Sequence, residues 1–201
     1  MDGTSTVLYQ GHASFRLSSP AGRAIFIDPY AGDGYDLEAD AVFCSHAHRD
    51  HSCVELVRLK PAGQVWLQRQ MYMDDAYAEV QVGDVTVRAV PAYNEKHPRE
   101  TTVGFLVGLG GKTLYFAGDT SKIPEMEALS GENIAYAFFP TDGFFNMDAE
   151  EASACAEIVG AAHSVPIHTC RNTGGIFNEE NALRFQAAGR VILRPGDRLE
   201  W

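Results

Sequence analysis

The chain has 201 residues, of which 45% are hydrophobic and 21% charged, and its formal net charge is −11. This length allows a single domain over residues 1–201 with a sizeable core, and the composition is that of a globular protein. No long apolar run occurs, so we expect no membrane span. The N-terminus lacks the basic region and the apolar region of a secretory signal, so we expect a cytoplasmic protein. The acidic charge favours a small-molecule substrate and disfavours nucleic acid.

In chain order, the first half is predicted to be mostly β-strand. Apolar runs bounded by glycine, proline and other turn residues are typical of short strands. One helix-like segment, residues 52–60, would end before Pro61. The predicted strands cover residues 5–10, 13–18, 23–29, 40–45, 64–68, 79–90, 101–110 and 112–118.

The second half mixes helices with strands. A short helix is predicted over residues 121–130, with Pro124 early in it. Residues 147–162 have the clearest helical pattern, because acidic residues stand at the N-terminal end and apolar residues recur at helical spacing. A third helix over residues 178–189 would be closed by Gly189. Strands are predicted at residues 134–140, 164–169, 190–195 and 197–201.

This order of elements predicts an α/β or α+β layered domain, with two sheets inside and helices outside. Four polar residues stand where predicted strands end. Strand ends hold side chains rigidly, so these residues predict a metal or catalytic site along the edges of the sheets. They are Asp28, His46, Asp119 and His168.

The stretch SHAHRDHS, residues 45–52, contains three of the seven histidines of the chain. Its spacing does not suit one face of a helix, whereas an extended segment lets His46 and His48 share a side. Asp50 and His51 would then turn toward a second point, so two adjacent ions explain the cluster better than one. Imidazole with carboxylate suits zinc, iron and manganese. The alternative is a solvated loop that happens to be rich in histidine.

The pattern His46-x-His48-x-Asp50-His51 resembles the HxHxDH signature of the metallo-β-lactamase fold superfamily. The segments look most like the group of metal-dependent hydrolases related to ascorbate-6-phosphate lactonase. The resemblance implies a four-layer αβ/βα sandwich with a dinuclear site at one edge of the sheets. It extends along nearly the whole chain, through residues 11–15, 26–30, 90–100, 115–120, 138–152 and 166–170.

The resemblance also implies which side chains bind the metals. His97 is the candidate third ligand of the first metal, because no other histidine lies between positions 51 and 163. The family often has glycine beside this histidine, whereas Pro98 follows it here. The implied set is His46, His48 and His97 for the first metal, Asp50, His51 and His168 for the second, and Asp119 as the bridge between them.

Without the resemblance, the distant residues have simpler explanations. Asp119 would fit a helix N-cap, since an aspartate before a short helix accepts from free backbone amides. His168 would fit a hydrogen-bonded core histidine, and His97 a solvent-exposed loop residue.

Further residues are candidates for support or substrate contact. His12, in the turn between the first two strands, would orient substrate or hydrogen-bond a ligand. Asp28 would fix the tautomer of a ligand histidine or form only an Asp-Pro turn. Arg99 would suit a phosphate or carboxylate, unless it is merely solvated. The candidates for the substrate pocket are Tyr93, Asn94, Arg99, Thr141, Asp142, Phe144, Arg171 and Asn172.

The sequence therefore predicts a metal-dependent hydrolase. Two divalent ions, zinc first and manganese or iron as alternatives, would activate a water for attack on a small ester, lactone or phosphodiester, with a lactone as the first expectation. The candidate catalytic residues are Asp50, Asp119 and His12. The alternatives are a nuclease or phosphodiesterase of the same fold and a metal-dependent binding or sensing protein. A homo-oligomer stays open.

Overall fold

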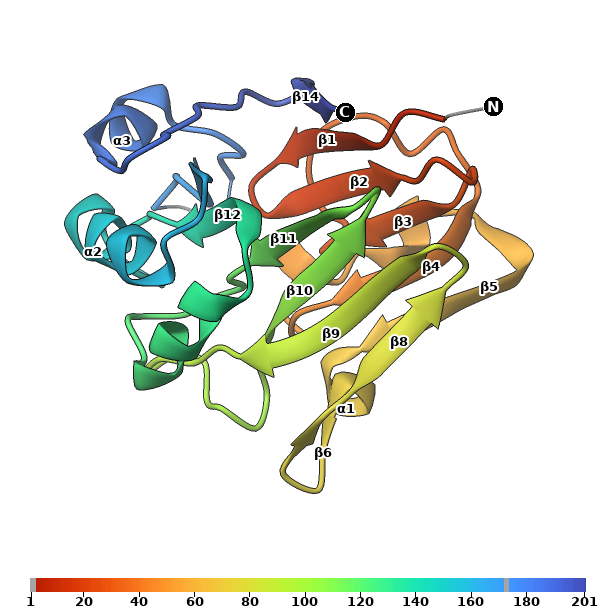
Figure 1. Cartoon of the computed structure of the whole chain (residues 1–201), viewed down its shortest axis with the longest axis horizontal. Helices are drawn as coiled ribbons and strands as arrows, with labels where there is room; N and C mark the ends of the chain where they lie inside the picture. The colour runs from red at the N-terminus through yellow and green to blue at the C-terminus, as the bar shows by residue number, and fades with distance from the viewer. Residues whose placement is uncertain (1–2, 172–173) are drawn as a thin grey trace.

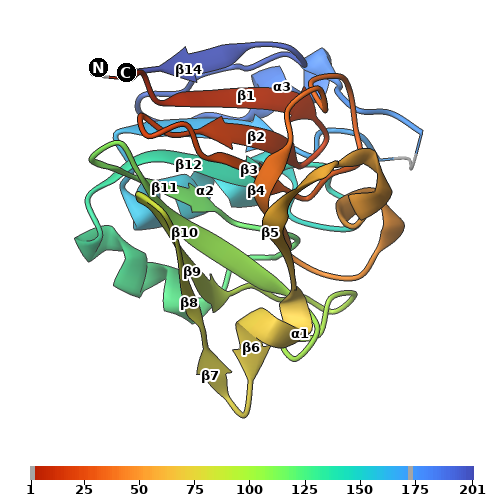
Figure 2. The same ribbon diagram turned by 90° about the vertical axis from the view of Figure 1, so that its right-hand side faces the viewer.

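Two six-stranded sheets pack against each other in the computed structural model, which describes residues 3–171 and 174–201 (Figures 1 and 2). The first sheet has the order β14 (Arg198–Glu200), β1 (Thr6–Gly11), β2 (Ser14–Ser18), β3 (Ala24–Ile27), β4 (Ala39–Cys44) and β5 (Leu59–Leu67). The second has the order β13 (His163–Ile167), β12 (Ile134–Pro140), β11 (Lys112–Phe116), β10 (Val103–Leu109), β9 (Val85–Pro91) and β8 (Glu79–Val82). A small hairpin of β6 (Tyr72–Met73) and β7 (Ala76–Tyr77) extends beside β8.

The main core lies between the two sheets. Alternate residues of each strand point inward, as the period of two in a strand requires, and they form one buried cluster. Phe15 of the first sheet packs on Phe116 and Phe138 of the second, with ring centroids 5.0 and 4.7 Å apart. Each such fully buried side chain contributes about 1.5–3 kcal/mol. The core therefore fixes the two sheets relative to each other, and with them the side chains at their edges.

The outer layers differ between the sheets. Helix α2 (Ala149–Val159) and the 3-10 helix η3 (Pro124–Gly131) bury their apolar residues on the second sheet. On the first sheet, the outer cluster is completed by the 3-10 turn η2 (Val54–Leu56) and by Tyr35, whose ring stacks on Phe26 at 5.6 Å. The predicted layered architecture is confirmed, although the first sheet is covered by turns in place of long helices.

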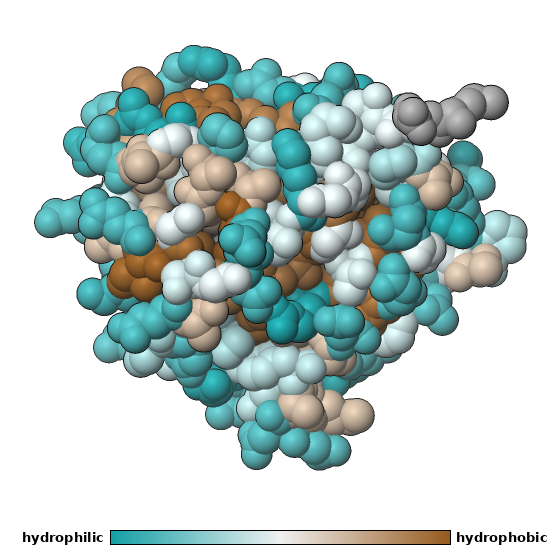
Figure 3. All heavy atoms as spheres, viewed as in Figure 1, coloured by the Kyte–Doolittle hydropathy of each residue, from teal (hydrophilic) through white to brown (hydrophobic). Residues whose placement is uncertain are grey.

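The surface agrees with this layering. Polar residues form most of the face shown in Figure 3, and hydrophobic residues show mainly in the recesses between them. No helix in the described part of the chain has both the length and the hydrophobicity needed to span a membrane.

The helix predicted over residues 52–60 is wrong. Only η2 forms there, and β5 begins at Leu59 and runs through Pro61. The strand accepts this proline because β5 lies at the edge of its sheet, where a missing N–H breaks no ladder. The register also shifts between Ala39 and Ala41 of the partner strand, which is typical of a bulge.

Three later predictions also need correction. Residues 124–131 form a 3-10 helix, in which Met126 and Leu129 are both buried, as three residues per turn allows. Helix α3 (Glu179–Arg184) is shorter than predicted because Phe185 leaves it to lie fully buried near Phe139. Residues 190–195 form no strand; Arg190 makes a single bridge to Ser164. The short helix α1 (Gln68–Met71) was not predicted.

Candidate metal centre

The predicted ligands lie together where strands of both sheets end. The residues of SHAHRDHS follow β4, the remainder follow β9, β11 and β13, and His12 lies in the turn between β1 and β2. Their ligand-type atoms form three overlapping groups, each with all its atoms within 4.8 Å of one another. The groups are His46, His48 and His97; His12, Asp50, His51 and His168; and His46, His51 and Asp119.

The first group consists of three imidazoles. His46 Nε2 lies 3.1 Å from His48 Nδ1, and the His97 ring centroid is 5.0 Å from that of His46 and 5.1 Å from that of His48. His97 is buried rather than solvent-exposed, so the loop alternative for this residue is wrong. The group brings together the three side chains that the resemblance implies for the first metal.

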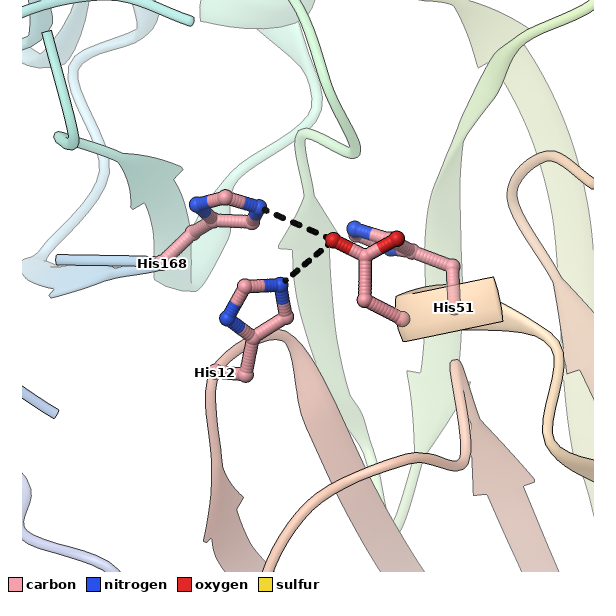
Figure 4. A group of neighbouring side chains, drawn as sticks. His12, His51 and His168 are labelled. Atoms are coloured by element: carbon pink, nitrogen blue, oxygen red, sulfur yellow. Dashed lines mark hydrogen bonds and ion pairs between the residues drawn. The ribbon is translucent and has the colours of Figure 1, made fainter. Parts of the chain in front are cut away.

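The second group gathers around Asp50. Figure 4 shows the three imidazoles of the group, those of His12, His51 and His168, which come from different segments and lie close together. Asp50 Oδ2 lies 3.2 Å from His12 Nε2 and 4.0 Å from His168 Nε2. The rings of His12 and His168 have centroids 3.8 Å apart. His12 therefore joins the three side chains expected at the second metal, as a hydrogen-bond partner of Asp50.

Asp119 stands between the two groups. Its Oδ2 lies 3.3 Å from His97 Nε2 and 3.7 Å from His168 Nε2, and its Oδ1 lies 3.3 Å from His51 Nε2. One carboxylate thus faces histidines of both groups, which is the position that a bridging ligand needs. The helix-cap alternative is wrong, because the helix that follows begins at Pro124 and is capped at Ile123 without a side chain.

Asp28 supports His51 from the side away from the centre. His51 Nδ1 lies 2.8 Å from Asp28 Oδ2, and an ionised carboxylate can only accept, so the imidazole carries its proton on Nδ1 and turns Nε2 toward the site. The hydroxyl of Ser45 donates to the same carboxylate at 2.7 Å and lies 3.0 Å from His46 Nδ1. Asp28 therefore has the contact predicted for it. Ser45 was missed, although it directly precedes the cluster.

Asn94 and Asp142, predicted to line the substrate pocket, contact histidines of the centre. Asn94 Oδ1 lies 3.0 Å from His97 Nδ1, and the buried Asp142 Oδ2 lies 3.1 Å from His168 Nδ1. Both therefore stand behind ligand histidines. Thr141, also predicted to contact substrate, is fully buried and donates to the Ile167 carbonyl at 3.3 Å.

The remaining pocket candidates are spread around the rim. Tyr93, Asn94 and Phe144 line a cavity of about 560 Å³. The guanidinium of Arg99, predicted either to hold a phosphate or carboxylate or to be solvated, is paired with Glu125. Arg171 Nε donates to the Asp142 carbonyl at 3.1 Å. Asn172 lies outside the described residues.

Backbone strain collects at the centre. His12, Asp28 and His168 have φ of 55°, 46° and 45°, the left-handed region that residues other than glycine rarely adopt. The carbonyl of His12 accepts from His168 N at 2.8 Å and from the hydroxyl of Tyr9 at 3.1 Å. Such conformations cost about 1–3 kcal/mol each and are typical of functional sites.

The carboxylates and imidazoles shift one another's pKa. Burial alone would lower the pKa of His51, but Asp119 and Asp28 outweigh it and raise the pKa to about 9. Burial would raise the pKa of Asp119, but the surrounding histidines hold it well below its usual value. Burial lowers the pKa of His12 to about 4, against the hydrogen bond to Asp50. The centre thus pairs ionised carboxylates with imidazoles of different basicity.

Three orphaned atoms test whether a cation fits. His51 Nε2, His168 Nε2 and Asp119 Oδ1 are buried and make no hydrogen bond within the described residues. Leaving such an atom unpaired costs about 1–3 kcal/mol, and all three face one another. Imidazole and carboxylate together are the donor set of zinc, manganese and iron sites. The residues therefore fit divalent metal.

Comparison with known proteins places these features in a family. The model of the β-lactamase superfamily domain matches residues 6–168. A UPF0173 metal-dependent hydrolase of Thermococcus onnurineus is 29% identical to the chain, and the match covers 96% of this chain and 98% of that protein. One of Pyrococcus furiosus is 28% identical with the same coverage.

Solved structures show the same fold. Igni18, a metallo hydrolase of Ignicoccus hospitalis, superposes with a TM-score of 0.72 at 19% identity over 98% of each chain. The metallo-β-lactamase fold protein YhfI of Bacillus subtilis gives a TM-score of 0.74 at 14% identity, over 99% of this chain and 100% of that chain.

Proposed function

Because the chain belongs to the metallo-β-lactamase superfamily and is a metal-dependent hydrolase, we propose that it holds two divalent cations and hydrolyses a small ester, lactone or phosphodiester. One observation carries this proposal. Orphaned ligand atoms of two histidines converge on Asp119, whose carboxylate also faces His97 of the first group. Two ions sharing one carboxylate account for both groups, whereas one ion would leave several of the donors unused.

Two bound ions supply an activated water and polarise the bond to be broken. The chain supplies the ligands and a route for the proton. Asp50 is the more accessible of the two carboxylates, with 25% of its side chain exposed against 4% for Asp119. We assign Asp50 the proton released from the attacking water, and His12 Nε2, 3.2 Å away, holds that carboxylate in place.

Among the possible substrates we propose a lactone first, and among the possible metals we propose zinc first. A small substrate is supported by a cavity of about 560 Å³ in the loops after β9 and β12, where Phe144 and Tyr93 offer apolar surface and Lys96 a cation. The net charge of −11 weighs against a nucleic acid held through its phosphates.

The first experiment measures metal per chain in protein purified without chelator, beside the double variant His48→Ala, Asp119→Ala. We expect about two ions in the wild type and few in the variant. The metal-loaded wild type is then assayed on esters, lactones and phosphodiesters. Cleavage of phosphodiesters alone would favour the phosphodiesterase alternative, and bound metal without turnover would favour a sensing protein. A wild type that holds no metal after reconstitution with zinc, manganese or iron contradicts the proposal.

A further inference from the structure

A chain of polar contacts joins the two groups of ligands on the side away from the metals. We call it the amide link; it runs from His97 through Asn94, Asn146 and Asp142 to His168. Three of the contacts are hydrogen bonds, and the last, from Asp142 to His168, is an ion-pair contact. Its central contact, Asn94 to Asn146, joins residues 52 positions apart in the sequence. The link therefore ties the loop after β9 to the loop after β12 and to the end of β13.

The orientation of Asn94 is fixed by the backbone. Its Oδ1 accepts from the N–H of Lys96 at 2.9 Å and from the N–H of His97 at 3.0 Å. A backbone N–H can only donate, so the oxygen must lie on this side. His97 Nδ1, 3.0 Å from the same oxygen, must then carry the proton, which leaves Nε2 free to bind metal.

The orientation of Asn146 follows from that of Asn94. Asn94 Nδ2 donates to Asn146 Oδ1 at 3.2 Å and to the carbonyl of Phe145 at 3.1 Å. Asn146 Nδ2 is thereby directed to Asp142 Oδ2, 2.9 Å away. An amide both accepts and donates at one end, so the side chain satisfies both neighbours at once.

Asp142 completes the link. Its Oδ1 accepts from the N–H groups of Phe144 and Asn146, at 2.8 and 3.3 Å, and its Oδ2 faces His168 Nδ1 at 3.1 Å. The position of Oδ2 beside Nδ1 favours a proton on Nδ1 of His168, and this tautomer presents Nε2 to the metal.

We propose that Asn146 is a positioning residue that holds one ligand histidine of each metal in its binding tautomer. It contacts neither ion and acts through Asn94 on the first metal and through Asp142 on the second. This inference rests on the proposed two-metal function. The consequence is that one half-buried side chain in a loop controls the metal affinity of both sites together.

The test is titration of zinc into chelator-stripped protein, for the wild type and for Asn146→Ala. We expect zinc affinity to fall at both sites, by about 10–100-fold as for other supporting partners of ligands. The melting temperature of the metal-free protein should change little. Asn146→Asp keeps the shape but cannot donate to Asp142 and should weaken zinc at least as much. Phe144→Ala is the matched control, because its exposed side chain lies in the same loop outside the link.

Two readouts separate the link from the proposed function. The ¹⁵N signals of His97 and His168 report their tautomers in metal-free protein, and we expect Nδ1–H in the wild type and a mixture in Asn146→Ala. Unchanged tautomers with unchanged zinc affinities, or a loss at one site only, would overturn the proposal. A wild type that bound no zinc would refute the two-metal function, while the tautomers would still decide whether the link acts.

Discussion

At the scale of single residues, the two groups of histidines differ in what stands behind them. His51 and His168 are backed by carboxylates, and the pKa of each is raised even though burial acts to lower it. His46 is backed by a hydroxyl and His97 by an amide, and burial lowers the pKa of both. Asp119 raises the pKa of both residues most, and the carboxylates behind them add to the effect. The site proposed for the second metal therefore has the more basic imidazoles.

Asp28 is therefore a suitable residue for testing how the carboxylate behind His51 affects metal binding. In Asp28→Asn, an amide replaces the acceptor behind His51, so neither the tautomer nor the orientation of the ring is fixed. We expect zinc at the second site to bind about 10–100-fold more weakly, as measured by titration. Asp36→Asn is the control, because Asp36 pairs with Arg16 away from the centre. Equal affinities in the wild type and Asp28→Asn would show that the contact does not position His51.

A variant of His12 can show whether this residue binds metal or only supports Asp50. In His12→Ala, Asp50 loses its hydrogen bond at 3.2 Å, and we expect turnover of any substrate found to fall about 10²-fold with metal content unchanged. His12→Gln, which can still donate to Asp50, should recover part of the rate. Loss of one ion per chain in His12→Ala would instead make His12 a ligand.

The sequence identified residues at this scale unevenly. Four residues of the centre lie within the eight positions of SHAHRDHS, and their spacing alone indicated metal. Asp119 and His168 are distant; their places at strand ends made them candidates, and only the resemblance gave them roles as metal ligands. Asn146 was missed, because its partners lie 52 positions back and 4 positions back and no local pattern marks such contacts.

At the scale of elements, periodicity recognised the strands but not their places in the sheet. Residues 52–60 were predicted as a helix, yet only η2 forms there and the chain enters the edge strand β5 at Leu59. Edge position is a property of the assembled sheet. Helix α2 was predicted well because its signals are local: Asp148 accepts from the N–H groups of Glu150 and Glu151, and Gly160 ends it with φ of 65°.

Gly118 shows how an element aims a side chain. It follows β11 with φ of 67°, and a Cβ there would lie 2.6 Å from the carbonyl oxygen of Val103. We expect Gly118→Ala to lose about 1–3 kcal/mol of unfolding free energy and to bind less metal, because Asp119 would be displaced. Gly111→Ala is the control, with φ of 77° and no atom within 4 Å. Denaturant unfolding and metal analysis measure both effects, and full metal content in Gly118→Ala would contradict them.

At the scale of the whole molecule, the centre joins the two sheets. The first sheet contributes His12, Asp28 and the SHAHRDHS residues, and the second contributes His97, Asp119, Asp142 and His168. A bound cation therefore links both halves of the fold. Because metal binds the folded chain and not the unfolded one, occupancy of the centre adds to the stability of the entire molecule.

The stability of the metal-free protein should depend on pH, because the pKa values of two histidines of the centre differ from those of the unfolded chain. In metal-free protein, the pKa of His51 is about 9 against 6.5 for the free side chain, and that of His168 is also raised. A raised pKa stabilises the fold fully below pH 6.5, and the contribution is lost as the pH rises through about 9. We therefore expect the melting temperature of chelator-treated protein to fall between these values.

Zinc-loaded protein should behave differently over the same range. Metal displaces the protons from Nε2 of these histidines, so higher pH strengthens binding and offsets the loss. Thermal unfolding followed by circular dichroism, with chelator and with zinc, checks both curves. The pKa values of His12, His46 and His97 are lowered, so these residues change stability only below pH 6.5 and not between pH 6.5 and about 9. A melting temperature of the metal-free protein that stays level or rises toward pH 9 would mean that Asp28 and Asp119 do not keep His51 protonated, and that the charge of the centre is balanced in another way.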